Sequence, residues 1–106
     1  MSNILIIDDD EMMCATLQAL VERQGHQTSS ATTLRDGFAC VAQQQIDLVF
    51  LDVHLPDGSG LDALARIEAS PCSPEVIIVT GYGDPNGAEL AINSGAWDYI
   101  EKGFSI

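Results

Sequence analysis

Three short apolar runs, "ILII" at 4–7, "LVFL" at 48–51 and "VIIV" at 76–79, set the strongest limit on the fold of this chain. Each run is rich in leucine or branched side chains and does not alternate with polar residues. This pattern is typical of strands that are buried on both faces of a parallel sheet. The runs therefore predict a sheet covered by helices on both sides.

Four segments carry helix signals. From Glu11 onward, apolar residues between Met13 and Val21 repeat at helical spacing, and Gly25 fits a C-terminal cap. Thr32 or Thr33 can cap the next helix, and Asp84-Pro85 opens the last one, with proline at the first helical position. The four predicted helices lie at about 11–25, 34–42, 61–70 and 84–95.

Two weaker strands complete the pattern. Residues 26–30 are polar, as an edge strand can be, and "WDYIE" at 97–101 alternates, as a strand with one wetter face does. Strands and helices then alternate along the chain, so the predicted fold is a doubly wound α/β domain. A length of 106 residues is enough for one such domain and no more.

Sixteen acidic and four basic residues give the chain a net charge of −12. Nucleic-acid binding needs a basic patch, which Arg23, Arg35, Arg66 and Lys102 cannot assemble. We therefore expect no contact with nucleic acid or with an anionic membrane, and the acidity instead favours cations and basic partner surfaces. No apolar run is long enough to span a bilayer and no signal peptide is visible, so we expect a cytoplasmic protein.

The cysteines and histidines do not indicate a site of their own. Cys14, Cys40 and Cys72 are odd in number and far apart in the chain, which argues against a disulfide framework or a zinc site. We interpret them as small, half-buried hydrophobic residues. His26 and His54 are too isolated for a Ser-His-Asp or Cys-His arrangement.

Polar residues follow four of the predicted strands at the points where they end. Asp8 and Asp9 follow the first strand, Asp52 the third, Thr80 the fourth and Lys102 the fifth. Ligands of open parallel sheets bind beyond the carboxyl ends of the strands, so these side chains are expected to meet at one rim. The neighbouring acidic pair at 10–11 is interpreted differently, as the start of the first helix near its positive end.

The chemistry of this set is that of a metal and a phosphoryl group. Clustered carboxylates repel one another, and a divalent cation such as Mg²⁺, which takes oxygen ligands, reverses the sign of that interaction. Lys102 can pair with a carboxylate or with a phosphoryl oxygen, and the Thr80 hydroxyl can donate to another. Asp52 can act as a nucleophile toward phosphorus and form an aspartyl phosphate.

The motifs "ILIIDDD", "DLVFLDVHLPDGSGL", "IIVTGYGD" and "GAWDYIEKGF" together resemble the receiver domain of two-component response regulators over essentially the whole chain. Three segments are most similar to receivers attached to AAA+ enhancer-binding transcription activators of the nitrogen-regulatory type. They are "LPDGSGL", "TGYGD" and "IEKGF". The resemblance implies a flavodoxin-like, five-stranded parallel sheet in the order 2-1-3-4-5. It also implies that residues 1–106 form one receiver domain, which stops before the usual fifth helix.

The resemblance implies a metal site at the acidic rim. Asp8 and Asp9 correspond to the acidic pair that holds Mg²⁺, with Asp9 as the direct ligand. Asp52 corresponds to the phosphoacceptor and contributes to the metal site. The backbone carbonyl of His54, two residues after the acceptor, corresponds to the third protein ligand, whereas its imidazole does not.

The resemblance further implies how the phosphoryl group is held and sensed. Thr80 and Lys102 correspond to the pair that grips the phosphoryl group, and Tyr99 corresponds to the aromatic residue that turns inward on activation. One departure concerns the residue after the lysine, which is usually proline in the family and is Gly103 here. A cis bond before a non-proline residue costs about 2.5–4 kcal/mol, so the bond to Gly103 is expected to be trans or strained.

Partners also follow from the resemblance. A histidine kinase or phosphotransfer protein would supply the phosphoryl group, and an attached output domain, transcriptional in this subfamily of bacterial proteins, would respond to it. The face of the fifth strand would serve for homodimer formation. The domain would catalyse its own phosphorylation and slow dephosphorylation without being an enzyme of ordinary turnover.

Other functions stay open on the residues alone. A receiver-like docking module that is not phosphorylated is one, because the proline and the last helix of the family are missing. A phosphatase of the haloacid-dehalogenase type is another, because Asp8 and Asp10 stand two apart after the first strand. Nucleotide binding is a third, although the spacing of Gly81, Gly83 and Gly87 is one residue longer than the dinucleotide fingerprint.

Overall fold

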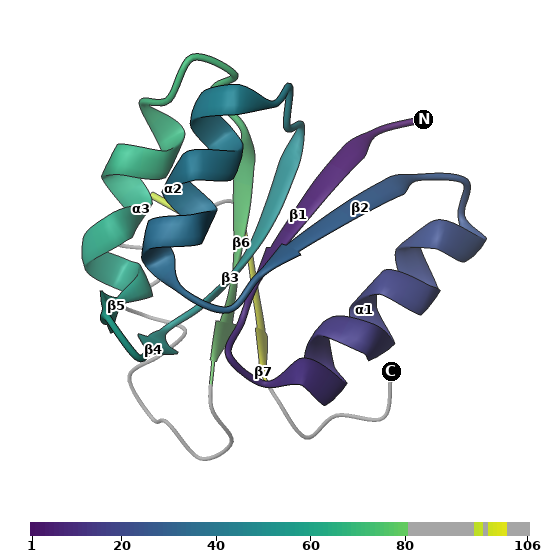
Figure 1. The fold of residues 1–106 in the computed structure, drawn as a ribbon, viewed down its shortest axis with the longest axis horizontal. Coiled ribbons are helices and arrows are strands. Elements are labelled where there is room, and N and C mark those ends of the chain that lie inside the picture. Colours follow the sequence, from purple (N-terminus) through teal and green to yellow (C-terminus); the bar gives the residue numbers. More distant parts are fainter. Residues whose placement is uncertain (81–94, 97, 102–106) are drawn as a thin grey trace.

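The computed structural model describes residues 1–80, 95, 96 and 98–101 of the chain (Figure 1). Within these residues a five-stranded parallel sheet has the order β2-β1-β3-β6-β7. When the strands of this sheet are counted along the chain, the order is 2-1-3-4-5, so the predicted doubly wound sheet is confirmed. Its strands are β1 (Asn3–Ile7), β2 (Gln27–Ala31), β3 (Leu48–Asp52), β6 (Glu75–Thr80) and β7 (Asp98–Glu101).

Three of the predicted helices are present as α1 (Glu11–Arg23), α2 (Leu34–Gln43) and α3 (Gly60–Glu68). Figure 1 shows α2 and α3 side by side on one face of the sheet and α1 on the opposite face. Because helices cover both faces, each central strand contains an unbroken run of four apolar residues rather than apolar residues at alternate positions. The fourth predicted helix, opened by Asp84-Pro85, lies outside the described residues. None of the helices that the structure describes is long and apolar enough to cross a membrane.

Side-chain caps fix where the first two helices begin. The carboxylate of Asp10 accepts hydrogen bonds from the backbone amides of Met12 and Met13, at 3.0 and 3.2 Å. Thr33, rather than Thr32, caps α2, because its hydroxyl accepts a hydrogen bond from the amide of Asp36 at 3.1 Å. Such caps satisfy amides that have no partner within the helix. Asp10 therefore belongs to α1, as predicted.

Apolar side chains alternate across the sheet and fill two cores. On β1, Leu5 and Ile7 belong to the larger core, which includes buried residues of α2 and α3. Ile4 and Ile6 belong to the smaller core, which includes Cys14 and Leu17 of α1. All four β1 residues are at most 4% exposed, and burying a side chain of this size contributes about 1.5–3 kcal/mol.

A short hairpin follows β3 at the carboxyl edge of the sheet. Its strands β4 (His54–Leu55) and β5 (Gly58–Ser59) pair antiparallel and form a sheet of their own. These two short strands were not predicted from the sequence. The hairpin leads directly into α3, so it connects the end of β3 to the helix that covers it.

Candidate functional site

The two buried carboxylates of the rim come from neighbouring strands. In the β1–β3 pairing Ile7 lies opposite Leu51, so the next residues, Asp8 and Asp52, stand at the same level. Asp8 and Asp52 are only 1% and 3% exposed. Since side chains alternate along a strand, Asp8 follows Ile6 and Asp52 follows Phe50 on the face that α1 covers. The core pattern of the strands therefore determines the side on which the carboxylates lie.

Asp9 completes a cluster of three acids. One carboxylate oxygen each from Asp8, Asp9 and Asp52 lie within 4.8 Å of one another, and Asp9 is exposed whereas the other two are buried. Oxygen ligands of this kind suit hard divalent cations. The structure thus brings together the three carboxylates that the sequence analysis proposed for a metal, and the arrangement could hold a divalent cation.

Contacts to the surrounding backbone hold Asp8 in place. Its Oδ1 accepts a hydrogen bond from the amide of Asp10 at 2.9 Å, and its own amide donates to the carbonyl of Ala31 at 3.0 Å. The buried thiol of Cys14, in α1, donates to the Asp8 carbonyl at 3.3 Å. The carboxylate of Asp10 is hydrogen-bonded to α1, which disfavours the haloacid-dehalogenase interpretation that needs Asp8 and Asp10 to act together.

The backbone after Asp52 is held close to its carboxylate. The amide of His54 donates to Asp52 Oδ1 at 3.4 Å, and the amide of Gly60 donates to the carbonyl of Val53 at 2.8 Å. A Cβ on Gly60 would collide with the Asp52 carbonyl and would lie 2.9 Å from its carbon atom. Glycine is therefore required at this position, because the chain must return within contact of the end of β3. The imidazole of His54 is exposed.

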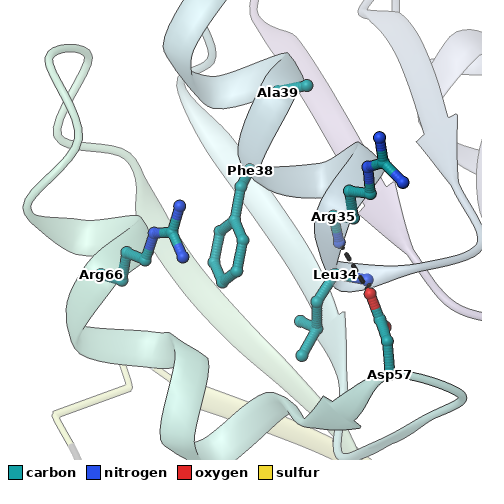
Figure 2. Close-up of a pocket in the computed structure, with 6 residues that line it drawn as sticks. All are labelled: Leu34, Arg35, Phe38, Ala39, Asp57 and Arg66. Atoms are coloured by element: carbon teal, nitrogen blue, oxygen red, sulfur yellow. Dashed lines mark hydrogen bonds between the residues drawn. The ribbon is translucent and has the colours of Figure 1, made fainter.

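Asp57, at the tip of the hairpin, makes a contact that sequence reasoning missed. Its two carboxylate oxygens accept hydrogen bonds from the backbone amides of Leu34 and Arg35, at 2.8 and 3.0 Å (Figure 2). These hydrogen bonds lower the pKa of Asp57 below its usual range. The segment "PDG" reads as a turn in any context, and no local signal reveals a partner 23 residues earlier in the chain.

A groove between α2 and α3 adjoins this contact. It is about 440 Å³ in volume and is open to solvent. The guanidinium of Arg66 stacks on the Phe38 ring, 3.8 Å from its centroid. Figure 2 shows Asp57 at one end of the groove, below the start of α2. The residues that line it are Leu34, Arg35, Phe38, Ala39, Asp57 and Arg66.

The remaining predicted site residues are placed only in part. Thr80 is the last residue of β6, one position beyond Val79, which pairs with Asp52, so its backbone lies at the same rim. Tyr99 lies in β7, where its backbone pairs with Ile78. Lys102 and Gly103 lie outside the described residues, as do the three glycines of the nucleotide-binding alternative.

Comparison with known proteins identifies the class of this domain. The sequence matches the response regulator receiver domain family over residues 4–106. The chain belongs to this family and is a receiver domain of a two-component system. The fold and the acidic cluster at the ends of β1 and β3 agree with that membership.

Among curated relatives, the transcriptional regulatory protein AfsQ1 of Streptomyces coelicolor is 33% identical over 102 residues, which cover 96% of this chain and 45% of AfsQ1. The transcriptional regulatory protein ZraR of Escherichia coli is 35% identical over 100 residues, which cover 94% of this chain and 23% of ZraR. The chain thus spans about half or less of the length of these relatives.

Solved structures show the same fold. The beryllofluoride-activated NtrC4 receiver domain dimer is 33% identical, with a TM-score of 0.88 over 99% of this chain and 87% of that chain. A response regulator from Burkholderia pseudomallei, solved with a phosphorylated aspartic acid, a calcium ion and citrate, is 27% identical with a TM-score of 0.87, over 99% of this chain and 62% of that one. The NtrC4 structure and ZraR confirm the predicted likeness to nitrogen-regulatory-type receivers.

Proposed function

We propose that Asp52 is the phosphoacceptor of this receiver domain. The observation that carries the proposal is the convergence of three carboxylates within 4.8 Å, two of which are buried at the ends of adjacent strands. Burying like charges together is costly unless a cation or hydrogen bonds compensate them. The phosphorylated aspartic acid and calcium ion of the B. pseudomallei regulator support the same assignment.

Asp8, Asp9, Asp52 and the backbone carbonyl of His54 would hold the metal ion, which we propose to be Mg²⁺. When bound, Mg²⁺ supplies positive charge that offsets the carboxylates and the incoming phosphoryl oxygens. The protein chain itself contributes the placement of these proposed ligands. The strand register sets Asp8 level with Asp52, and the short path through His54 and Gly60 keeps the following backbone beside the acceptor.

In the reaction, a carboxylate oxygen of Asp52 attacks the phosphorus of a phosphohistidine. An oxygen–phosphorus bond forms, the phosphorus–nitrogen bond breaks, and its electron pair stays on the imidazole of the donor. Thr80 and Lys102 are proposed to donate to the phosphoryl oxygens, and Tyr99 is proposed to change position as the domain switches. Slow hydrolysis by water would return Asp52 to its free form.

The partners are proposed from the family. Residues 1–106 would form one receiver domain that takes its phosphoryl group from a histidine kinase or phosphotransfer protein in the cytoplasm. It would switch a transcriptional output domain and dimerise through the face of β7. The relatives named above are transcriptional regulators, and the NtrC4 receiver is a dimer, which supports both proposals.

Labelling with acetyl phosphate tests the proposal. With Mg²⁺ present, the wild-type chain should gain one phosphoryl group by intact-mass analysis, and chelation of the metal should prevent this. Asp52→Asn should abolish labelling, whereas Asp36→Asn, which removes an exposed carboxylate of α2, should leave it unchanged. An unlabelled wild-type chain, or undiminished labelling of Asp52→Asn, would refute the assignment.

A further inference from the structure

The first turn of α2 receives two caps from different parts of the chain. Thr33, its own N-cap, accepts a hydrogen bond from the amide of Asp36 at 3.1 Å. The two preceding amides, of Leu34 and Arg35, donate to Asp57, which lies 23 residues after Leu34. Thr33 by itself is an ordinary N-cap. The two hydrogen bonds that Asp57 accepts therefore come in addition to a cap that the helix already has.

Asp57 belongs to the hairpin that carries His54. Leu55 pairs with Gly58 and His54 with Ser59, so that Pro56 and Asp57 alone form the turn. A Cβ placed on Gly58 would lie 3.0 Å from Cδ1 of Leu34, so the backbone of this glycine passes close to the start of α2. The tip of the hairpin is therefore hydrogen-bonded to α2 through Asp57 and lies beside it at Gly58.

The opposite end of the hairpin is attached to the acceptor strand. There the His54 amide donates to Asp52 Oδ1 at 3.4 Å, and the Gly60 amide donates to the Val53 carbonyl at 2.8 Å. A hairpin attached at this end alone could pivot about the strand that it follows. Because its tip is also tied to α2, the backbone between the two attachments, which includes His54, has a defined position.

We infer that Asp57 is a positioning residue for the metal site, which it serves by holding the hairpin so that the backbone of His54 stays beside Asp52. This inference rests on the proposed function, in which the His54 carbonyl is a metal ligand. Asp57 itself touches neither the metal nor the phosphoryl group. It keeps the backbone around His54 ordered before the metal binds. The binding free energy is then not reduced by the entropy cost of ordering that backbone.

The charge of Asp57 suits this contact. Its carboxylate lies at the positive end of α2, where an anion is stabilised, and the hydrogen bonds from Leu34 and Arg35 lower its pKa. The acid therefore stays ionised at neutral pH and accepts from both amides. An asparagine there keeps one acceptor oxygen and turns an N–H group toward the other amide, so it can restore only part of the contact.

Calorimetric titration with Mg²⁺ tests the inference on the full chain. Asp57→Ala should raise the Mg²⁺ Kd roughly fivefold to tenfold, the factor that corresponds to ordering about one further backbone residue on binding. Asp57→Asn should give an intermediate Kd. At saturating Mg²⁺ the rate of labelling by acetyl phosphate should return close to that of the wild type, since the bound metal then orders the segment.

Thr33→Ala is the matched control, because it removes the other cap of the same helix without touching the hairpin. Like Asp57→Ala, it should lower the stability of the metal-free chain, yet it should leave the Mg²⁺ Kd unchanged. A Kd for Asp57→Ala within about twofold of the wild type, or an equal rise in Thr33→Ala, would overturn the inference while leaving the proposed function intact.

Two further experimental outcomes also test the inference. If Asp57→Ala does not fold, Asp57→Asn is compared with Asp62→Asn, which removes the same charge from the rim of the groove between α2 and α3. Equal Mg²⁺ affinities of those two variants would overturn the inference. If the wild type neither binds Mg²⁺ nor becomes labelled, the proposed function fails and the positioning role fails with it.

Discussion

Asp9 is the member of the acidic cluster whose charge can be removed with the least disturbance to packing. It is exposed, whereas Asp8 and Asp52 are buried. The substitution Asp9→Asn keeps the shape of the side chain and removes one of three negative charges. We expect it to stabilise the metal-free domain and to weaken the stabilisation by Mg²⁺, two effects of opposite sign in one variant.

The first effect follows from the separation of the charges. Two unit charges 4.8 Å apart, the largest separation in the cluster, interact with about 1 kcal/mol in a water-like dielectric and about 3.5 kcal/mol at an effective dielectric of 20. Asp9 takes part in two such pairs and is exposed, so the lower value applies to each. Removing its charge should raise the free energy of unfolding by about 1–2 kcal/mol in the absence of metal.

The second effect follows from binding linkage. At a free Mg²⁺ concentration ten times the Kd, the wild type should gain about 1.4 kcal/mol in its free energy of unfolding. Asp9→Asn should lose most of this gain, because it removes the proposed direct ligand and one unit of attraction. The stability difference between the two proteins should therefore shrink or reverse when Mg²⁺ is added.

Urea denaturation followed by circular dichroism measures both effects, in EDTA and in MgCl₂ at matched ionic strength. Glu11→Gln is the control, since it changes the net charge equally at an exposed position just outside the cluster. It should cost about 0.3–1 kcal/mol, because an anion favours the start of α1, and should keep the Mg²⁺ gain. An Asp9→Asn protein that is no more stable in EDTA, or that keeps the full gain, would refute the reasoning.

Two further predictions concern stability. Gly60→Ala should lower the free energy of unfolding by about 2–3 kcal/mol in urea titrations, because its Cβ meets the Asp52 backbone, which cannot yield as a side chain can; wild-type stability would contradict this. The pKa of Glu68 is raised by partial burial and then by the charge of Glu75. A raised pKa means that the charged form costs stability above the folded-state pKa. This cost fades as pH falls below that value and is gone below the unfolded-state pKa. Glu68→Gln should therefore melt higher than the wild type near pH 7, the gap should close near pH 4, and a pH-independent gap would show that ionisation is not the cause.

The sheet was predictable from the sequence because its signal is local and dense. Each central strand is an unbroken apolar run, and burial on both faces of a parallel sheet requires such runs. The starts of α1 and α2 were predictable for a similar reason, since the caps at Asp10 and Thr33 act within three residues. The acidic cluster followed from topology, because the strands that precede Asp8 and Asp52 are parallel neighbours.

The hairpin after β3 was not predictable in the same way. Its strands are two residues each, too short for any periodicity to be read. The contact of Asp57 with α2 joins segments that are distant in the chain, and an aspartate before a glycine indicates a turn whether or not it caps a helix. Tyr99 was correctly assigned to a strand, and Thr80, expected just after one, is the last residue of β6. The predicted roles of both, like that of Lys102, remain predictions.

The alternation of side chains across β1 and β3 has a consequence for how such domains can diverge. Asp8 and Asp52 lie on the side of α1 because each continues the two-residue repeat of the strand before it. Exchanging one branched apolar residue for another preserves that parity, so core composition can drift freely. Inserting or deleting one residue within either strand turns the acid toward the opposite layer, even if the core remains apolar. The number of residues in each strand, more than the choice of apolar residues, thus decides which layer the acid faces.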